Sequence, residues 1–185
     1  RTNGATGKYG KCMSFDGTDD YVETPAINIG TGPVTFSVWA KGGSRAVNQE
    51  IGLITAYQSG KPWFFTLERS SWGSGGVMMY VGYPDQTPNS IGGGLWAPSD
   101  TNWHYIAMTR DSSSIKVYFD GKEVVNSTHT NFTNFDVGNK PIRIGYPSQY
   151  YWDNLIDDVR IYNYARTADQ IMQDYNQGMA MKMGE

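Results

Sequence analysis

The feature that most constrains the fold is a series of short segments that alternate apolar and polar residues, each bounded by Gly, Pro, Asn, Asp or Ser. Segments of this length and spacing are typical of an antiparallel sandwich and not of a βαβ fold. Asp120-Gly121 separates two of them, which predicts a type I′ hairpin because both central residues of that turn need positive φ. We therefore expect an all-β protein, a two-sheet antiparallel jelly-roll sandwich. Its expected strands are residues 11–15, 20–24, 34–41, 50–57, 62–69, 76–83, 103–110, 114–120, 122–126, 141–146 and 155–163.

One short C-terminal helix is predicted after the last strand. Thr167 and Gln170 have the spacing of a capping box, in which each side chain accepts a hydrogen bond from the other residue's backbone amide. Gly178 is the expected stop of that helix. We expect one jelly-roll domain over residues 1–178 and a tail over residues 179–185.

Charge and cysteine content exclude some classes of partner and any internal disulfide. The net charge is −3 and basic residues form no run, so neither nucleic acid nor an anionic membrane surface is an expected partner. No stretch reaches 18 apolar residues, which argues against membrane insertion. The single cysteine, Cys12, excludes an internal disulfide, and its apolar-alternating strand predicts a buried thiol.

The sequence contains no recognisable catalytic set. Paired carboxylates of the E-x-D-x-E type are missing, and neither His104 nor His129 neighbours a G-x-S-x-G nucleophile motif. Zinc-type ligand spacing is also missing. We expect this chain not to be an enzyme.

Two acidic segments stand out. Asp16, Asp19 and Asp20 fall within five residues, where they repel one another unless water, backbone donors or a cation separates them. Asp157 and Asp158 lie in the last strand. Strict alternation would place Asp157 on the core-facing row, where a carboxylate needs a cation or backbone donors, together with Leu155, Val159 and Ile161.

Four segments in order carry a family resemblance. Residues 7–25 (GKYGKCMSFDGTDDYVETP), 34–41 (VTFSVWAK), 102–124 (NWHYIAMTRDSSSIKVYFDGKEV) and 155–171 (LIDDVRIYNYARTADQI) are similar to those of the laminin-G-like, concanavalin A-like jelly-roll family, part of a pentraxin-like lectin/glucanase superfamily. The resemblance implies two packed antiparallel sheets of about six or seven strands. The family contains glycan-binding modules, adhesion domains, pentraxin-like proteins and non-catalytic parts of secreted hydrolases, so the fold alone does not give the function.

The resemblance also implies a structural calcium ion between the early acidic segment and the last strand. Calcium takes six to eight oxygen ligands, mixing carboxylates, carbonyls and water. Mapped onto this sequence, the expected ligands are Asp16, Asp20, Asp157 and Asp158. The alternatives are a solvated turn for the first pair, backbone amides for Asp157, and an ion pair with Arg160 or Arg143 for Asp158.

The first strand usual in that family, of the W-x-F-D-E-G type, has no counterpart before residues 1–10. An uncovered sheet edge is a template for strand addition. Two interpretations stay open: the chain is shortened at this end, or another segment, a strand-supplying partner chain or an assembly covers the edge.

Glycan contacts would use aromatic rings, which stack on sugars, with amide and carboxylate neighbours that bind hydroxyl groups. Packing of the aromatic cluster at residues 150–154 against the terminal helix is the alternative. Two sequons, at Asn126 and Asn131, are candidate glycosylation sites. The candidate glycan-binding residues are Trp72, Trp96, Tyr150, Tyr151, Trp152, Asp153 and Asn154.

These observations lead to a functional expectation. We expect a non-catalytic binding or adhesion module, extracellular or on the cell surface, that binds glycan and is stabilised by calcium. The alternative is a structural subunit or decorating domain of a surface filament, sheath or adhesin, suggested by the absent first strand, the sequons and the low charge.

Overall fold

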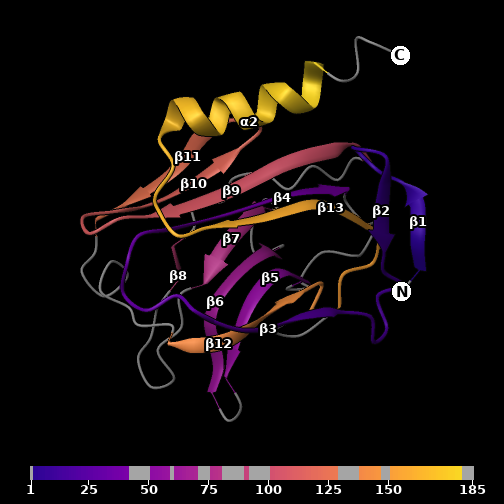
Figure 1. Cartoon of the computed structure of the whole chain (residues 1–185), viewed down its shortest axis with the longest axis horizontal. Coiled ribbons are helices and arrows are strands. Elements are labelled where there is room, and N and C mark those ends of the chain that lie inside the picture. The colour runs from indigo at the N-terminus through magenta and orange to yellow at the C-terminus, as the bar shows by residue number, and fades with distance from the viewer. Residues whose placement is uncertain are drawn as a thin grey trace.

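The computed structural model describes residues 2–41, 51–58, 61–70, 76–80, 90–91, 101–128, 138–146 and 151–180. These residues form two antiparallel sheets and a helix (Figure 1). The seven-stranded sheet has the order β1 (Thr2–Thr6), β2 (Lys11–Ser14), β13 (Leu155–Tyr162), β4 (Val34–Lys41), β9 (Trp103–Arg110), β10 (Ile115–Phe119) and β11 (Lys122–Ser127). The six-stranded sheet has the order β3 (Val22–Asn28), β12 (Asn139–Ile144), β5 (Ile51–Gln58), β6 (Lys61–Ser70), β7 (Gly76–Tyr80) and β8 (Ser90–Ile91).

The main core lies between the sheets. Alternate residues of β4, such as Phe36 and Val38, point inward and meet Ile142 and Ile144 of β12. Burial of such side chains removes apolar surface from water and is the main favourable contribution to folding. The predicted two-sheet sandwich is confirmed, and Cys12 is buried as expected. Burial raises the pKa of its thiol, and the nearby charge of Asp157 adds to that shift.

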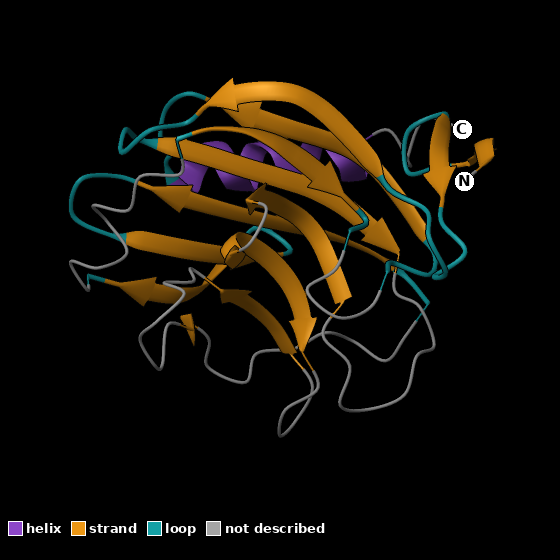
Figure 2. Ribbon diagram, turned by 90° about the horizontal axis from the view of Figure 1, so that it is seen from below, coloured by secondary structure: helices purple, strands orange, loops and turns teal. Residues whose placement is uncertain are grey.

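The helix α2 (Ala168–Ala180) covers the outer face of the seven-stranded sheet. Figure 1 shows α2 across β9, β10 and β11, and Figure 2 shows it on the far side of the strands. A second core lies beneath the helix, so β4 is buried on both faces. This second core contains Trp39, Tyr105, Ala107, Tyr118 and Ile171.

The hairpin turn and the capping box predicted from the sequence are both confirmed. Asp120 and Gly121 both have positive φ, 48° and 79°, between β10 and β11. The Thr167 amide donates to the Gln170 side chain at 3.0 Å, and the Gln170 amide donates to the Thr167 hydroxyl at 3.3 Å. The expected stop at Gly178 is wrong, because α2 continues to Ala180. A glycine inside a helix costs only about 1 kcal/mol relative to alanine, so it does not by itself end one.

An ionic group centred on a buried carboxylate attaches α2 to the sheet, and we call it the α2 clamp: Arg160, Arg166, Asp174 and Tyr105. The Asp174 carboxylate accepts a hydrogen bond from Arg166 at 2.8 Å and lies 3.9 Å from the Arg160 guanidinium. The Tyr105 hydroxyl donates to the same carboxylate at 3.4 Å. Asp174 is 7% exposed, so this charge is compensated inside the protein.

Residues Thr2–Thr6 form β1, which pairs with β2 at the edge of the seven-stranded sheet. The question of a further strand on that edge, and of a chain to supply it, stays a prediction. Among the residues that the structure describes, no helix is long and apolar enough to cross a bilayer.

Candidate functional site

Three tyrosines gather at one rim of the sandwich, and we call Tyr21, Tyr146 and Tyr151 the tyrosine patch. The rings of Tyr21 and Tyr146 meet edge to face with centroids 5.2 Å apart. Those of Tyr146 and Tyr151 do the same at 5.6 Å. Tyr21 is 39% exposed, one of two large apolar side chains among the described residues that are so accessible. The patch therefore presents an exposed aromatic ring on a packed aromatic base.

Strand pairing brings these rings together. Ile144 of β12 pairs with Val22 of β3, so Tyr21 and Tyr146 leave neighbouring strands at the same rim. The next cross-strand pair is Arg143 with Glu23, and their side chains form an ion pair. The Arg143 guanidinium lies over two rings, 4.5 Å from the centroid of Tyr146 and 5.3 Å from that of Tyr21. The cation therefore both stacks on the patch and binds a carboxylate.

Gly145 holds the base of the patch. Its φ is +77°, a left-handed conformation that residues with a Cβ rarely adopt. A Cβ there would lie 2.7 Å from the Phe15 ring. The Gly145 amide donates to the Leu53 carbonyl, and its own carbonyl accepts from the Trp152 amide, both at 3.0 Å. One glycine thus connects three chain segments beneath the tyrosines.

A cluster of carboxylates adjoins the patch, and we call Asp16, Asp19 and Asp20 the acid triad. Each offers an oxygen within 4.8 Å of the others. Asp16 accepts from the Thr18 amide at 2.8 Å, and the Asp20 carboxylate accepts from the Asp16 amide at 3.3 Å. These turn bonds arrange the three side chains locally. Carboxylates this close form part of an oxygen set of the kind that a hard cation takes.

Electrostatics connect the acid triad to the patch. Burial is the largest cause that raises the pKa of the Tyr151 hydroxyl, and the neighbouring Tyr146 and the charge of Asp19 add to it. At Arg143, burial lowers the pKa of the guanidinium. The hydrogen bond and charge of Glu23 outweigh that effect, so the pKa lies above its usual value. Arg143 is therefore a permanent cation that already has a carboxylate partner.

The predicted four-carboxylate calcium site does not assemble. Ser14 pairs with Leu155 and Met13 with Ile156, so Asp16 and Asp157 lie on opposite sides of the Ser14–Leu155 pair. At about 3.3 Å per residue, they are roughly 13 Å apart along the strands. Asp19, which was not among the expected ligands, lies with Asp16 and Asp20 instead.

The face predicted for Asp157 is also wrong, because a bulge interrupts β13. The register shifts between Asp157 and Arg160, and Asp158 takes φ +48°. One extra residue reverses the alternation. Asp157 therefore pairs with Trp39 of the second core, and the inner row contains Ile156, Val159 and Ile161.

Backbone donors bind the buried Asp157 carboxylate, one of the alternatives that the sequence left open. The amides of Tyr9 and Asp158 both donate to it at 2.8 Å. The Asp158 carboxylate accepts a hydrogen bond from the Arg160 guanidinium at 2.8 Å, which is the ion pair that the sequence offered as the alternative for Asp158. Asp157 and Asp158 thus hold the structure together at the bulge.

The prediction that Trp152 contacts a glycan is wrong. Trp152 is 3% exposed and lies in the main core, so its ring cannot stack on a ligand, and it does not pack on the helix either. Tyr151 belongs to the tyrosine patch. Asn154 stabilises the adjoining turn, since its carbonyl accepts from the Phe15 amide at 3.0 Å and its side chain from the Leu155 amide at 2.9 Å.

Asp153 is half-buried in the same turn. Of the two sequons, Asn126 is exposed on β11, where its side-chain amide donates to Glu123 at 3.2 Å. Its glycosylation stays a prediction. Four of the predicted site residues lie outside the described residues: Trp72, Trp96, Tyr150 and Asn131.

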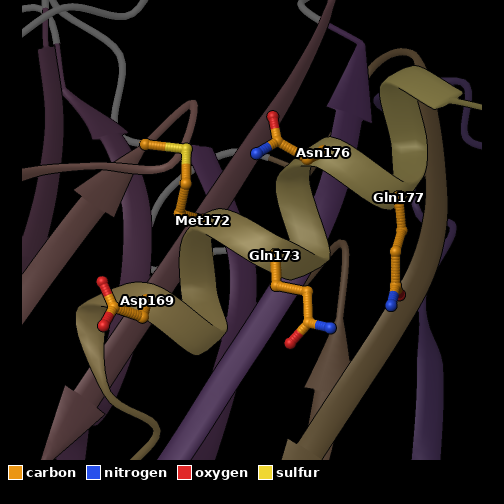
Figure 3. Close-up of a pocket in the computed structure, with 5 residues that line it drawn as sticks. All are labelled: Asp169, Met172, Gln173, Asn176 and Gln177. Carbon is orange, nitrogen blue, oxygen red and sulfur yellow. The ribbon is translucent and has the colours of Figure 1, made fainter.

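A hollow of about 430 Å³ lies along α2 (Figure 3). Its described lining comes from the helix alone, and none of the predicted site residues borders it. Because one helix forms that lining, the hollow has no described opposite wall to enclose a ligand. The lining residues are Asp169, Met172, Gln173, Asn176 and Gln177.

Sequence analysis did not nominate Tyr21, Tyr146, Arg143 or Glu23. The available signal was the large number of tyrosines, 13, which exceeds the needs of a core. Only the β3–β12 pairing, across some 120 positions, shows which of them share a rim.

The sequence profile of the concanavalin A-like lectin/glucanases superfamily matches residues 16–172. The chain belongs to this superfamily. A comparison with curated proteins found no relative. The matched span includes the acid triad, the whole tyrosine patch and the start of α2, so the candidate site lies within the concanavalin A-like domain.

Solved structures of this fold are similar to the chain. Domain 4 of the GH43 extracellular arabinanase AbnA from Geobacillus stearothermophilus, in complex with arabinotriose, gives a TM-score of 0.71 at 23% identity, over 91% of this chain and 78% of that one. The native heptameric SAP-like pentraxin from Limulus polyphemus gives a TM-score of 0.65 at 13% identity, over 86% of this chain and 78% of that one.

The binding domain of botulinum neurotoxin DC, in complex with SialylT, gives a TM-score of 0.63 at 13% identity. The match covers 80% of this chain but only 36% of that one. At these identities the likenesses establish the concanavalin A-like fold and nothing finer.

Proposed function

We propose that this concanavalin A-like domain is a non-catalytic, extracellular glycan-binding module whose contact surface is the tyrosine patch. The observation that carries the proposal is the exposed Tyr21 ring, held edge-on by Tyr146. A flat ring held in place stacks on a sugar face with little loss of conformational entropy. Two of the similar structures are complexes that support this class: domain 4 of AbnA with arabinotriose, and the binding domain of botulinum neurotoxin DC with SialylT.

Non-catalytic action is part of the proposal. It rests on the missing E-x-D-x-E and G-x-S-x-G patterns. Glycoside hydrolysis needs two carboxyl groups placed on either side of the bond that is cleaved. The acid triad instead comes from one five-residue turn, so its carboxylates approach a bound sugar from one side. An assay for released reducing ends on arabinan is expected to show no turnover.

The test is binding of an oligosaccharide panel that includes arabinotriose, measured by titration calorimetry. Tyr21→Ala is expected to weaken binding about tenfold or more, because a stacked ring at a contact centre contributes more than about 1 kcal/mol. Thermal stability should change little, since Tyr21 is exposed.

Tyr164→Ala is the matched control. Tyr164 is 42% exposed and packs edge to face on Tyr162 at 5.5 Å, yet it lies next to α2, away from the acid triad. Equal losses in the two variants would reject the tyrosine patch as the contact surface. No binding to any panel member would reject the glycan function and leave the structural-subunit alternative, which sedimentation for large assemblies would test.

We also propose that calcium stabilises the module through the acid triad. Asp16, Asp19 and Asp20 would supply three of the six to eight oxygens, and backbone carbonyls and water the others. Calcium at about 100 times its Kd should then add about 2.7 kcal/mol to the free energy of unfolding, seen as a higher Tm.

Asp19→Asn should remove the calcium-dependent rise in Tm. Asp157→Asn is the control, because the Asp157 carboxylate already accepts two backbone amides. It should lower stability but keep the response to calcium. A rise that survives Asp19→Asn, or a wild type that does not respond, would contradict the calcium proposal.

A further inference from the structure

The cation that the structure places against the tyrosine patch is Arg143. A guanidinium beside aromatic rings is a natural binding group for a carboxylated sugar, because its planar donors match a carboxylate. In this chain those donors are already in use: the Arg143 Nε donates to the Glu23 carboxylate across the strand pair. The Arg143 side chain is only 18% exposed, so its approach is also restricted.

Negative charge surrounds this ion pair. Glu23 is the more exposed partner, at 40%, and so it faces an arriving ligand more than the arginine does. The acid triad lies beside the patch, and the charge of Asp19 reaches the Tyr151 hydroxyl. A carboxylated sugar would have to displace Glu23 from Arg143 and approach four carboxylates, whereas an uncharged sugar meets only rings and acceptors for its hydroxyl groups.

We infer that Glu23 makes the tyrosine patch selective for uncharged glycans over glycans that carry uronic or sialic acid. The inference rests on the proposed glycan-binding function and adds to it the class of ligand. Glu23 acts here as a specificity residue: it occupies the guanidinium that would otherwise bind an acidic sugar, and its own charge repels that sugar.

The experiment uses the whole chain on a glycan array in which each neutral oligosaccharide has a counterpart carrying a uronic or sialic acid. The readout is the ratio of acidic to neutral affinity, measured in EDTA so that any bound calcium is removed. In Glu23→Gln this ratio should rise about tenfold or more, because Arg143 loses its charged partner across the strand pair and the negative charge that repels an acidic sugar is removed. The gained acidic binding should weaken as salt is added.

Glu123→Gln is the matched control. Glu123 forms a comparable exposed ion pair with Lys116, at 3.3 Å, on β11 and β10. Its replacement should leave the ratio unchanged. Adding Arg143→Gln to Glu23→Gln should abolish the gain, which would show that the gain depends on the Arg143 guanidinium and not on a change in folding.

The outcomes separate the two proposals. A wild type that prefers acidic counterparts, or a Glu23→Gln ratio equal to that of the wild type, would overturn the selectivity and leave glycan binding in place. A wild type that binds no array member would overturn both.

Discussion

The tyrosine patch and the α2 clamp use the same residue types to different ends. The clamp combines one tyrosine, two arginines and a carboxylate, and the tyrosine patch lies against an arginine that is paired with a carboxylate. In the clamp, Asp174 and Tyr105 are 7% and 1% exposed, and their bonds join the helix to the sheet. In the patch, Tyr21 is 39% exposed. The residue types alone therefore do not distinguish a stabilising cluster from a contact surface, but the extent of burial does.

Burial also changes what each arginine contributes. Arg166 binds Asp174 where water cannot compensate either charge, so loss of one partner is costly. The Arg143–Glu23 pair is more exposed and contributes little to stability. What it controls instead is which ligand charge can approach. We therefore expect substitutions in the clamp to change stability, and substitutions on the surface of the patch to change binding.

The largest expected effect is in the clamp. Asp174→Ala leaves the largely buried Arg166 guanidinium without its carboxylate and should lower the free energy of unfolding by about 3–5 kcal/mol. Urea denaturation measures this loss. Gln173→Ala, at the exposed neighbouring position, should change it by less than about 0.5 kcal/mol. Similar losses of unfolding free energy in the two variants would show that the clamp does not stabilise the protein to this extent.

The base of the patch should give the next largest effect. Gly145→Ala combines a left-handed backbone with a Cβ 2.7 Å from Phe15, which should cost about 2–4 kcal/mol. Gly32→Ala is the control, since nothing lies within 4 Å of a Cβ there. A stable Gly145→Ala variant would mean that the rim adapts and that the patch is less rigid than the clamp.

The smallest expected effect separates the tyrosines of the two regions by alkaline titration. Burial is the main cause that raises the pKa of both Tyr105, well above the usual range, and Tyr151. A hydroxyl whose pKa is higher in the folded state stabilises the protein fully below the unfolded value of 10.0. That stability is lost as the pH rises through the folded pKa.

Between pH 9 and pH 11, Tyr105 should account for a loss of stability on the order of 1 kcal/mol. Tyr105→Phe should remove that part of the loss, and Tyr151→Phe a smaller part, because Tyr151 is less buried. Denaturation curves at the two pH values measure the difference. An equal effect of both substitutions would contradict the contrast between a buried clamp and an accessible patch.

Much of the fold could be predicted because its signals are local. Alternation located most of the strands but not β1 or β8, and β4 and β9 have the predicted bounds. Asp120-Gly121 closes a hairpin because its φ requirements lie within two residues. The capping box involves atoms only three positions apart. The bulge at Asp158 gives no such local signal, and the extra residue placed Asp157 on the opposite face from the one predicted.

The sequence by itself determined the class of fold, the superfamily, the acidic turn and the surplus of tyrosines. It left open which aromatic residues are exposed, and it put Trp152 at the surface when that ring lies in the core. Tyr21, Glu23, Arg143 and Tyr146 become one site only when β3 pairs with β12. Burial and long-range pairing depend on the whole chain at once, which is why only the tertiary structure decided the candidate site.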